Sequence, residues 1–317
     1  MKNILINCAI SIISIIIMFL IAEGLIRTKN MDMKNYNIEM WKYTKELKIK
    51  SDDVNLAFYH KPSSEAILQS VKIRTNNYGL RGENIAKERI TNRRILFLGS
   101  SATLGWGVDE ENIMTTLLAK KFGKDVEILN AGVGNYNSVR YTELFFTKLK
   151  ELEPTDIVVH FFLNDADDLQ IPNTNWFLQN SQLAVLIWNA FTVLASENDS
   201  LINYYDKLYD ENYVGYKNMI NSLDKLSKYS KENNIRLYFA SLPDLHYLED
   251  DKLDRYYKRV QEIVISKGFK FLNLQDGFDK GIKSKDLWVM PTDAHPNILA
   301  HKLMAEQIYP FLIIENK

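Results

Sequence analysis

The chain has 317 residues, of which 46% are hydrophobic and 25% are charged, and its formal net charge is -1. These values are ordinary for a globular protein and exclude the disordered, collagen-like and disulfide-scaffold classes. A nucleic-acid-binding protein normally carries a clear basic excess, so the balanced charge argues against such a partner. The single cysteine, Cys8, allows neither an internal disulfide nor a cysteine zinc cluster.

The first predicted element is an apolar N-terminal segment. No charged residue lies between Ile4 and Ala22, and the segment extended to Ile26 supplies the roughly 20 apolar residues that span a bilayer. The alternative is a secretory signal peptide, whose apolar stretch is usually only about 7–15 residues long, with Ala22 and Gly24 at its cleavage site. The longer run favours a transmembrane anchor over residues 1–26. Basic residues flank it too evenly to indicate an orientation.

Residues 27–90 show few strong periodicities. The stretch Val71–Arg74 alternates like a short strand, and residues 76–79 are typical of a turn. We predict that this segment is a stalk, or N-terminal extension, that packs on the main domain and does not form a domain of its own.

The rest of the chain, residues 91–317, is predicted to be one α/β domain. Its short apolar runs are continuous, as in strands buried on both faces, and they alternate with amphipathic stretches. This alternation predicts a parallel five-stranded sheet with helices on both sides. We expect strands over residues 95–98, 126–129, 156–162, 235–240 and 269–272, and helices over residues 112–122, 139–152, 219–229, 256–266 and 297–309.

An insertion over residues 169–212 interrupts this alternation. It holds the apolar block Leu183–Leu194, which contains Trp188. The favoured interpretation is a helical excursion packed on the domain. A substrate lid and a membrane-facing patch are the alternatives.

Polar or glycine-bearing segments stand at the ends of three strands and before the last helix. The first strand is followed by GSSATLG (99–105), the second by NAGVGN (130–135) and the third by LND (163–165), while TDAHPN (292–297) precedes the last helix. In parallel sheets ligands bind beyond the carboxyl ends of the strands. The four segments are therefore expected to meet at one edge of the sheet.

Together these segments contain the groups that acyl transfer needs. Ser101 is the candidate nucleophile, since a serine hydroxyl becomes reactive only when a base takes its proton. His295 is the candidate base, and Asp293 would orient its imidazole. The backbone amides of Ser101 and Gly134 and the side-chain amide of Asn164 could stabilise the oxyanion. The alternatives are that Ser101 only caps a helix and that Asn164 only forms a turn.

Several other polar and aromatic residues receive less specific interpretations. Trp106, beside the serine segment, could stack on a sugar ring or pack in the protein interior. His160 and His301 are expected to be core histidines, whereas His246 has no acidic or serine context that we can use. The aspartates near residue 165 are interpreted as a solvated loop and not as a cation site. We therefore predict neither a metal nor a cofactor.

In this order the four segments resemble the four sequence blocks of the SGNH (GDSL-like) hydrolase superfamily. The resemblance runs from about Arg94 to the C-terminus, outside the insertion. It implies a flavodoxin-like three-layer α/β/α fold, with Ser101, Gly134, Asn164 and His295 as the four family residues. There is no G-x-S-x-G elbow of the α/β-hydrolases around Ser101.

Two positions depart from the pattern of this superfamily. Ser100 stands where the first block often has aspartate. The acid partner usually stands three residues before the histidine, a position held here by Thr292, whereas Asp293 stands two before it. Some polysaccharide O-acetyltransferases of the superfamily use the shorter spacing, so Asp293 remains the candidate acid.

The resemblance and the apolar N-terminus together imply a single-pass protein of the cell membrane with an extracytoplasmic catalytic domain. The expected activity is that of a serine-dependent ester hydrolase or O-acyl(acetyl)transferase. The expected substrate is an ester-bearing molecule such as an acylated, or acetylated, cell-envelope polysaccharide. One alternative is a lipase or thioesterase whose acyl-chain site is formed by the insertion. Another is a non-catalytic binding component of an envelope assembly complex.

Overall fold

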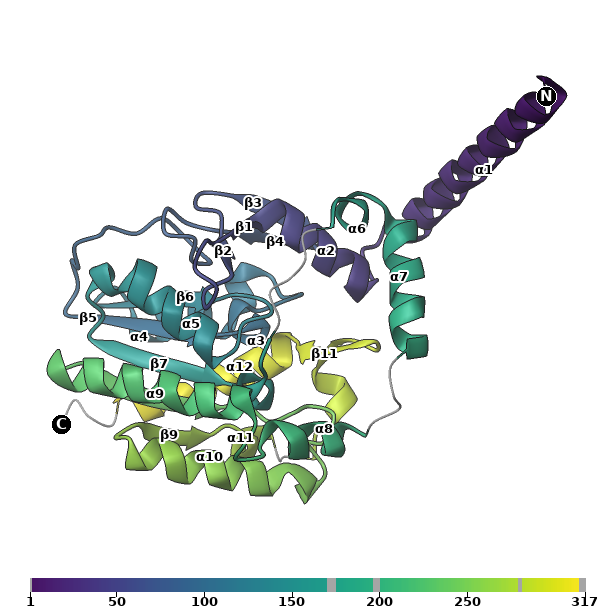
Figure 1. Ribbon diagram of the computed structural model, residues 1–317. Helices are drawn as coiled ribbons and strands as arrows, with labels where there is room; N and C mark the ends of the chain where they lie inside the picture. Colours follow the sequence, from purple (N-terminus) through teal and green to yellow (C-terminus); the bar gives the residue numbers. More distant parts are fainter. Residues whose placement is uncertain (1, 170–174, 196–199, 279–280, 314–317) are drawn as a thin grey trace.

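The centre of the fold is a five-stranded parallel sheet (Figure 1). This computed structural model describes residues 2–169, 175–195, 200–278 and 281–313. The strands are β5 (Arg93–Gly99), β6 (Val126–Gly132), β7 (Asp156–Phe161), β8 (Arg236–Ser241) and β9 (Lys270–Asn273), in the spatial order β6-β5-β7-β8-β9. Counted from the first strand of this sheet, that is the 2-1-3-4-5 order of flavodoxin-like folds. The predicted fold class is confirmed.

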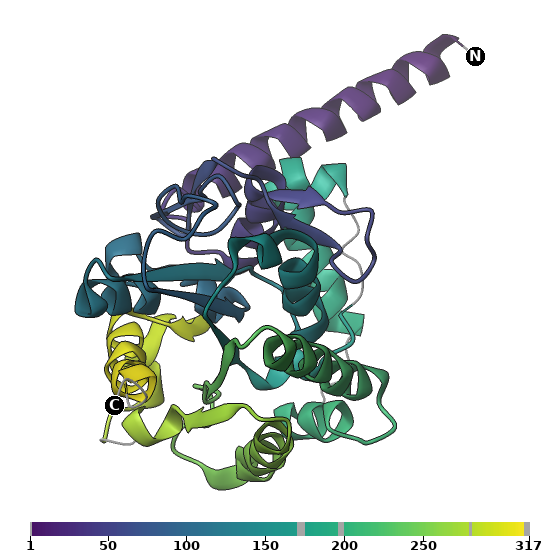
Figure 2. The same cartoon turned by 90° about the vertical axis from the view of Figure 1, so that its left-hand side faces the viewer.

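Helices cover both faces of the sheet (Figure 2). One layer contains α5 (Ser138–Leu144), α9 (Val214–Glu232) and α10 (Asp254–Ser266); the other contains α4 (Met114–Phe122), the short α11 (Gln275–Phe278) and α12 (Ile298–Ile313). Along β5, Leu96 and Leu98 pack in the first layer, and Ile95 and Phe97 pack in the second. Successive side chains of a strand point to opposite faces of the sheet, and helices cover both faces, so the side chains on each face must be apolar. This requirement explains the continuous apolar runs in the sequence.

The N-terminal extension has more regular structure than its sequence indicates. It contains α2 (Tyr36–Leu47) and two antiparallel hairpins, β1 (Lys48–Lys50) with β2 (Phe58–His60) and β3 (Glu65–Leu68) with β4 (Val71–Arg74). The strand predicted at Val71–Arg74 is present, whereas helix α2 was not predicted. A cluster of buried side chains from the extension packs against Leu104 and Trp106 of the main domain; it comprises Tyr43, Leu47, Ala66, Leu68, Val71 and Ile73.

Helix α1 (Lys2–Lys29) projects away from the rest of the protein and has no buried residue (Figure 1). Among the helices that the structure describes, it is the one long and apolar enough to cross a membrane, with a mean hydropathy of 2.9 over its best window. This finding rests on length and composition. It does not place either end of the helix on a particular side of a membrane.

The described residues of the insertion form α6 (Trp176–Asn180), α7 (Gln182–Ala195) and α8 (Leu201–Leu208). Helix α8 packs on the main domain through the buried Tyr205 and Leu208. In contrast, α6 and α7 contact α2, and α7 also contacts α1. Only part of the insertion is therefore a helical excursion on the main domain. Residues 170–174 and 196–199 of the predicted insertion lie outside the described residues.

Two short elements complete the carboxyl edge of the sheet. Helix α3 (Ser101–Leu104) follows β5, and the hairpin of β10 (Trp288–Met290) and β11 (Asp293–Pro296) precedes α12. Helix α3 lies directly against the end of β6, where a Cβ on Gly132 would stand 2.1 Å from the backbone nitrogen of Leu104. Glycine at this position lets the two backbones meet. The close contact fixes α3 relative to the sheet.

At the opposite edge, a buried carboxylate joins three strands. Asp156 at the start of β7 has a fully buried side chain and accepts hydrogen bonds from Arg93 at 2.6 and 3.0 Å and from Arg236 at 2.9 Å. Arg93 is also nearly fully buried, with a side chain 6% exposed. Removing one member of such a pair leaves an uncompensated charge in the interior.

We therefore expect Asp156→Ala to lower the free energy of unfolding by about 3–5 kcal/mol, because the buried Arg93 loses its counter-charge. Urea unfolding of the detergent-solubilised chain, followed by circular dichroism, measures this change. Asp224→Ala is the control, since Asp224 pairs with Lys267 but its side chain is 54% exposed, and exposed pairs contribute little. Similar losses in the two variants would contradict the prediction.

Candidate active site

Ser101, His295 and Asp293 form one hydrogen-bonded series at the carboxyl edge of the sheet. The Oγ atom of Ser101, in the first residue of α3, lies 2.8 Å from Nε2 of His295. Nδ1 of His295 is hydrogen-bonded to Oδ1 of Asp293, which also accepts the backbone N–H of His295 at 3.1 Å. Asp293 and His295 both lie in β11, where residues two apart face the same side. The extended backbone therefore accommodates the two-residue spacing.

The second carboxylate oxygen of Asp293 is also occupied. Oδ2 accepts hydrogen bonds from Nε2 of Gln69 at 2.7 Å and from Nε1 of Trp106 at 3.2 Å. Burial alone would raise the pKa of Asp293, but the hydrogen bond and charge of His295, together with the hydrogen bond from Gln69, more than offset this and lower it. Asp293 is therefore ionised at neutral pH and can hold a proton on Nδ1 of His295. Nε2 is then free to accept one.

Of the two interpretations given for Trp106, the structure agrees with packing in the protein interior. Its side chain is only 1% exposed, and the ring packs against Tyr36 and Tyr43 while its N–H donates to Asp293. A residue buried in this way cannot offer a face to a substrate. Trp106 supports the acid instead.

Tyr36 is a further site residue that was not predicted. Its ring stacks on that of His295, with centroids 5.7 Å apart and planes 30° apart, and it lines the cavity next to Ser101. Burial and the charge of Asp293 raise the pKa of Tyr36 to about 12, so the phenol remains protonated. Tyr36 and Gln69 both come from the extension interpreted as a stalk.

The cavity has a volume of about 390 Å³ and opens at the carboxyl ends of the strands. Ser101, His295 and Asn164 line it together, so three predicted site residues from separate segments do meet. Asn164 lies in the 3-10 turn Leu163–Ala166 after β7 and is exposed to the cavity. The volume of the cavity is within the usual range for small-molecule sites, about 300–1,000 Å³.

Gly134 does not have the role predicted for it. Its backbone N–H donates to Oη of Tyr43 at 2.9 Å, and its carbonyl oxygen accepts from Nζ of Lys48 at 2.8 Å. Both polar groups of this peptide are therefore engaged by the N-terminal extension, and the amide is not available to an oxyanion. The prediction is corrected on this geometry.

The next residue, Asn135, lies at the cavity around Ser101. It has a φ of 65°, and no acceptor for its amide is found in the described part of the chain. Asparagine is one of the few residues other than glycine that adopt this left-handed conformation readily. The sequence signal that could have indicated this left-handed position was the asparagine directly after Gly134.

A chain of hydrogen bonds through His60 and Tyr43 holds the peptide of Gly134. Burial lowers the pKa of His60 to about 3, so its ring is neutral. Nδ1 of His60 lies 3.1 Å from the carbonyl oxygen of Gly79, and Nε2 lies 2.5 Å from Oη of Tyr43. Since the carbonyl oxygen of Gly79 can only accept, the one proton of the neutral ring lies on Nδ1, and Nε2 accepts the hydroxyl of Tyr43, whose oxygen accepts the N–H of Gly134. The extension thus fixes the loop that carries Asn135.

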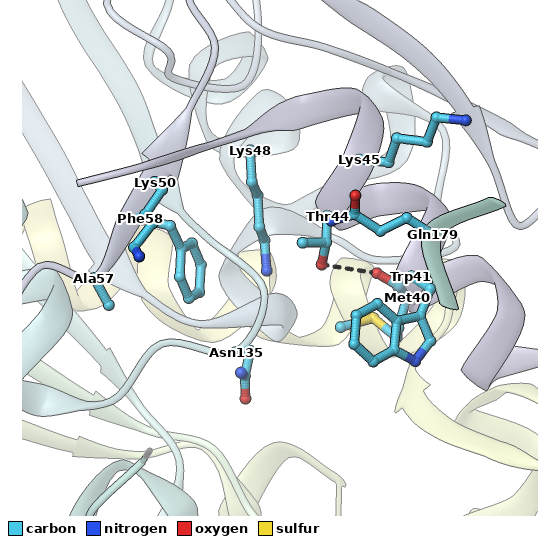
Figure 3. Close-up of a pocket in the computed structure, with 10 residues that line it drawn as sticks. All are labelled: Met40, Trp41, Thr44, Lys45, Lys48, Lys50, Ala57, Phe58, Asn135 and Gln179. Atoms are coloured by element: carbon cyan, nitrogen blue, oxygen red, sulfur yellow. Dashed lines mark hydrogen bonds between the residues drawn. The ribbon is translucent and has the colours of Figure 1, made fainter. Parts of the chain in front are cut away.

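A second cavity, of about 350 Å³, also has Asn135 in its lining (Figure 3). It is bounded by α2, β1 and β2 and shares Asn135 with the cavity around Ser101. Trp41, Lys45 and Lys50 line it together with the buried Lys48, whose Nζ stands 4.0 Å from the centre of the Phe58 ring. Burial lowers the pKa of Lys48. Sequence reasoning did not identify this cavity.

Asp244 and His246 form a second Asp-x-His pair on the cavity around Ser101. Nδ1 of His246 lies 2.8 Å from Oδ1 of Asp244, which also accepts the backbone N–H of His246 at 2.9 Å. The hydrogen bond with Asp244 raises the pKa of His246. Trp288 packs on His246 and donates to the carbonyl of Leu245 at 3.1 Å. The interpretation that His246 lacks an acidic partner is wrong, because Asp244 is bonded to its ring. The sequence did contain a signal for this pair, namely the same two-residue spacing as between Asp293 and His295.

The remaining histidines and acids lie outside the series around Ser101. His160 and His301 are buried and hydrogen-bond to Thr103 and to the backbone of Met114, respectively, as expected of core histidines. Asp165 is buried and accepts the N–H of Phe162, so it is not part of a solvated loop as predicted. Within the described ranges, no group of three or more His, Cys, Asp or Glu residues could hold a metal ion.

The support of the Gly134 peptide can be tested with Tyr43→Phe. We expect this change to lower the free energy of unfolding by about 1–3 kcal/mol for each buried group left unpaired, namely the N–H of Gly134 and Nε2 of His60. Chemical unfolding measures the loss. Tyr59→Phe is the matched control, because Tyr59 is only partly buried and its ring contact with Lys148 does not need the hydroxyl. If both variants were as stable as wild type, the series would not support the loop.

No protein-family model matches the sequence, and no curated protein does. Several solved structures are similar to it. One is a proposed lipolytic protein of the G-D-S-L family from Desulfitobacterium hafniense, with 13% identity over 69% of this chain and 99% of that protein and a TM-score of 0.44. Another is a psychrotrophic esterase from Pseudoalteromonas sp., with 18% identity over 70% of this chain and 97% of the esterase and a TM-score of 0.43. A third is the lipase/acylhydrolase from Enterococcus faecalis, with 12% identity over 69% of this chain and 95% of that enzyme and a TM-score of 0.42. The solved structures to which this chain is similar thus include lipolytic hydrolases, esterases and acylhydrolases, one of them of the G-D-S-L family.

Proposed function

We propose that the protein is a serine ester hydrolase or acyltransferase of the SGNH type that works through an acyl-enzyme on Ser101. The observation that carries this proposal is the series from Oγ of Ser101, through His295 at 2.8 Å, to the carboxylate of Asp293. As Oγ attacks the ester carbonyl, Nε2 of His295 takes its proton and then returns it to the departing alkoxide. Asp293 keeps the proton on Nδ1 and stabilises the imidazolium that forms.

The tetrahedral intermediate needs donors for its negatively charged oxygen. The backbone amides of Ser101 and Asn135 and the side-chain amide of Asn164 are the proposed donors, since all three residues line the same cavity. Each well-placed donor lowers the barrier by about 2.7–4 kcal/mol. The left-handed backbone of Asn135 is part of this arrangement, because it turns the chain directly after the fixed peptide of Gly134.

The acyl-enzyme can be released by water, which is hydrolysis, or by a sugar hydroxyl, which is transfer. We propose an acylated cell-envelope glycan as the substrate, with α1 as a membrane anchor and the catalytic domain outside the cytoplasm. The second cavity supports a substrate larger than the acyl group, because it meets the first at Asn135 and offers the partly buried ring of Trp41 and two exposed lysines, Lys45 and Lys50. Aromatic rings and hydrogen-bond donors suit a sugar.

The alternative of a lipase with its acyl-chain site in the insertion has less support. None of the α7 residues that the structure describes lines the cavity around Ser101. The lining of that cavity includes the charged or polar side chains of Asp167, Asp244 and His246. These groups and the cavity's volume of about 390 Å³ favour a short acyl group, such as acetyl, over a long chain.

The proposal is tested first by Ser101→Ala. Hydrolysis of p-nitrophenyl acetate should fall by a factor on the order of 10⁶, because no other hydroxyl among the described residues is bonded to His295. Labelling by a fluorophosphonate probe should disappear as well, with an unchanged unfolding midpoint. Ser100→Ala is the matched control, since Ser100 is the preceding residue and makes no side-chain cap to α3. A folded Ser101→Ala protein that still hydrolyses the ester at the wild-type rate would contradict the proposal.

The glycan subsite is tested separately with Trp41→Ala. We expect KM for chemically acetylated oligosaccharides to rise about tenfold, equivalent to about 1.4 kcal/mol of lost binding, while kcat/KM for p-nitrophenyl acetate stays unchanged. The reason is that the small ester does not reach the second cavity. Lys72→Ala, an exposed change in β4, is the control. An unchanged KM for every acetylated glycan, in a variant with normal p-nitrophenyl acetate activity, would reject the subsite.

A further inference from the structure

Helices α6 and α7 expose an unusual amount of apolar surface. Seven large side chains, each between 42% and 83% exposed, form what we call the insertion patch: Trp176, Phe177, Ile187, Trp188, Phe191, Val193 and Leu194. Helix α7 contains no charged residue along Gln182–Ala195. Soluble monomeric proteins rarely leave a contiguous patch of this kind in water, so it marks an interaction surface.

The last turns of α1 hold the first turn of α7. The carboxylate of Glu23 accepts hydrogen bonds from Oγ of Ser181 at 2.8 Å and from the backbone N–H groups of Gln182 and Leu183 at 3.0 and 2.9 Å. These are amides that a helix start leaves without internal partners, and a negative charge there is favourable. Arg27 pairs with Glu23 at 2.6 Å and donates to the carbonyl of Asn180 at 2.8 Å. The two helices are therefore joined by polar contacts, not only by packing.

This junction lies where the apolar stretch of α1 ends. The uncharged run from Ile4 to Ala22 is followed directly by Glu23. At about 1.5 Å per helical residue this run matches the roughly 30 Å hydrocarbon core of a bilayer. A spanning α1 would thus put Glu23 and Arg27 at the level of the lipid head groups. In both views α7 leaves from the base of α1 and runs beside the body of the protein (Figures 1 and 2).

We propose that the insertion patch lies in the interfacial layer of the bilayer that α1 crosses. This inference rests on the proposed anchoring role of α1 and does not depend on the esterase activity. Continuity with α1 favours lipid as the occupant over a protein partner, since the patch begins at the point where the membrane helix ends. Trp176 and Trp188 fit this position, because tryptophan favours the boundary between head groups and acyl chains. Helix α7 would then lie along the membrane surface, with its aromatic and aliphatic side chains in the lipid.

The test uses the full chain in lipid nanodiscs that contain lipids brominated near the head group, which quench nearby tryptophan fluorescence. Helix α1 contains no tryptophan, so any quenching reports on the rest of the protein. We expect strong quenching in the wild type and loss of most of it when Trp176→Phe and Trp188→Phe are combined. Trp288→Phe is the matched control, because Trp288 lies in β10 and packs on His246, and it should keep the wild-type quenching.

Two outcomes would overturn the proposal. Quenching that persists in the Trp176→Phe, Trp188→Phe variant would place other tryptophans at the lipid instead of the patch. Absence of quenching in the wild type, together with cross-linking between two chains through α7, would show that a second copy covers the patch. Ester hydrolysis is measured in the same nanodiscs, so loss of activity and loss of membrane contact are distinguished.

Discussion

The carboxylate of Asp293 receives hydrogen bonds from three separate parts of the chain. His295 binds one oxygen from within β11, while Gln69 of the extension and Trp106 after α3 bind the other. A buried charge is tolerated only when it is paired and its remaining lone pairs are satisfied. These donors therefore have to be in place together, and they set the position of the imidazole that faces Ser101. The β10–β11 hairpin, the extension and the serine helix are all fixed by this requirement.

The N-terminal extension is a structural part of the site. Its helix α2 provides Tyr36 to the ring of His295 and Tyr43 to the peptide of Gly134, and its β1 strand provides Lys48 to the same peptide. The main sheet alone would leave that loop and the acid without these contacts. Tyr43 and Leu47 of α2 share one apolar cluster with Leu68 and Val71, the residues that flank the β3–β4 turn, so disorder in one of these parts of the extension would disturb the other. Contacts to Asp293 and to the loop that carries Asn135 thus depend on the same packing.

The sheet and the meeting of the candidate site residues at one cavity were predictable because their signals are local. Continuous apolar runs follow from burial on both faces of a parallel sheet, and Ser101, Asn164 and His295 stand where those runs end. The supporting contacts were not predictable. Gln69 and Asp293 are separated by 224 residues, and neither has a neighbour in sequence that indicates the other. The difference between Gly134 and Asn135 likewise depends on Tyr43, a residue from an unpredicted helix.

Only residues 30–35 separate the end of α1 from the start of α2, which carries Tyr36. Even fully extended, a connection of this length reaches about 20 Å. If α1 crosses a bilayer, as proposed above, so short a connection keeps the start of α2 close to the lipid surface. For a substrate held at the same surface, encounters would then occur in two dimensions, at a rate governed by the surface density of the substrate and by lateral diffusion instead of by bulk concentration. Lengthening this connection would widen the layer that the enzyme can reach.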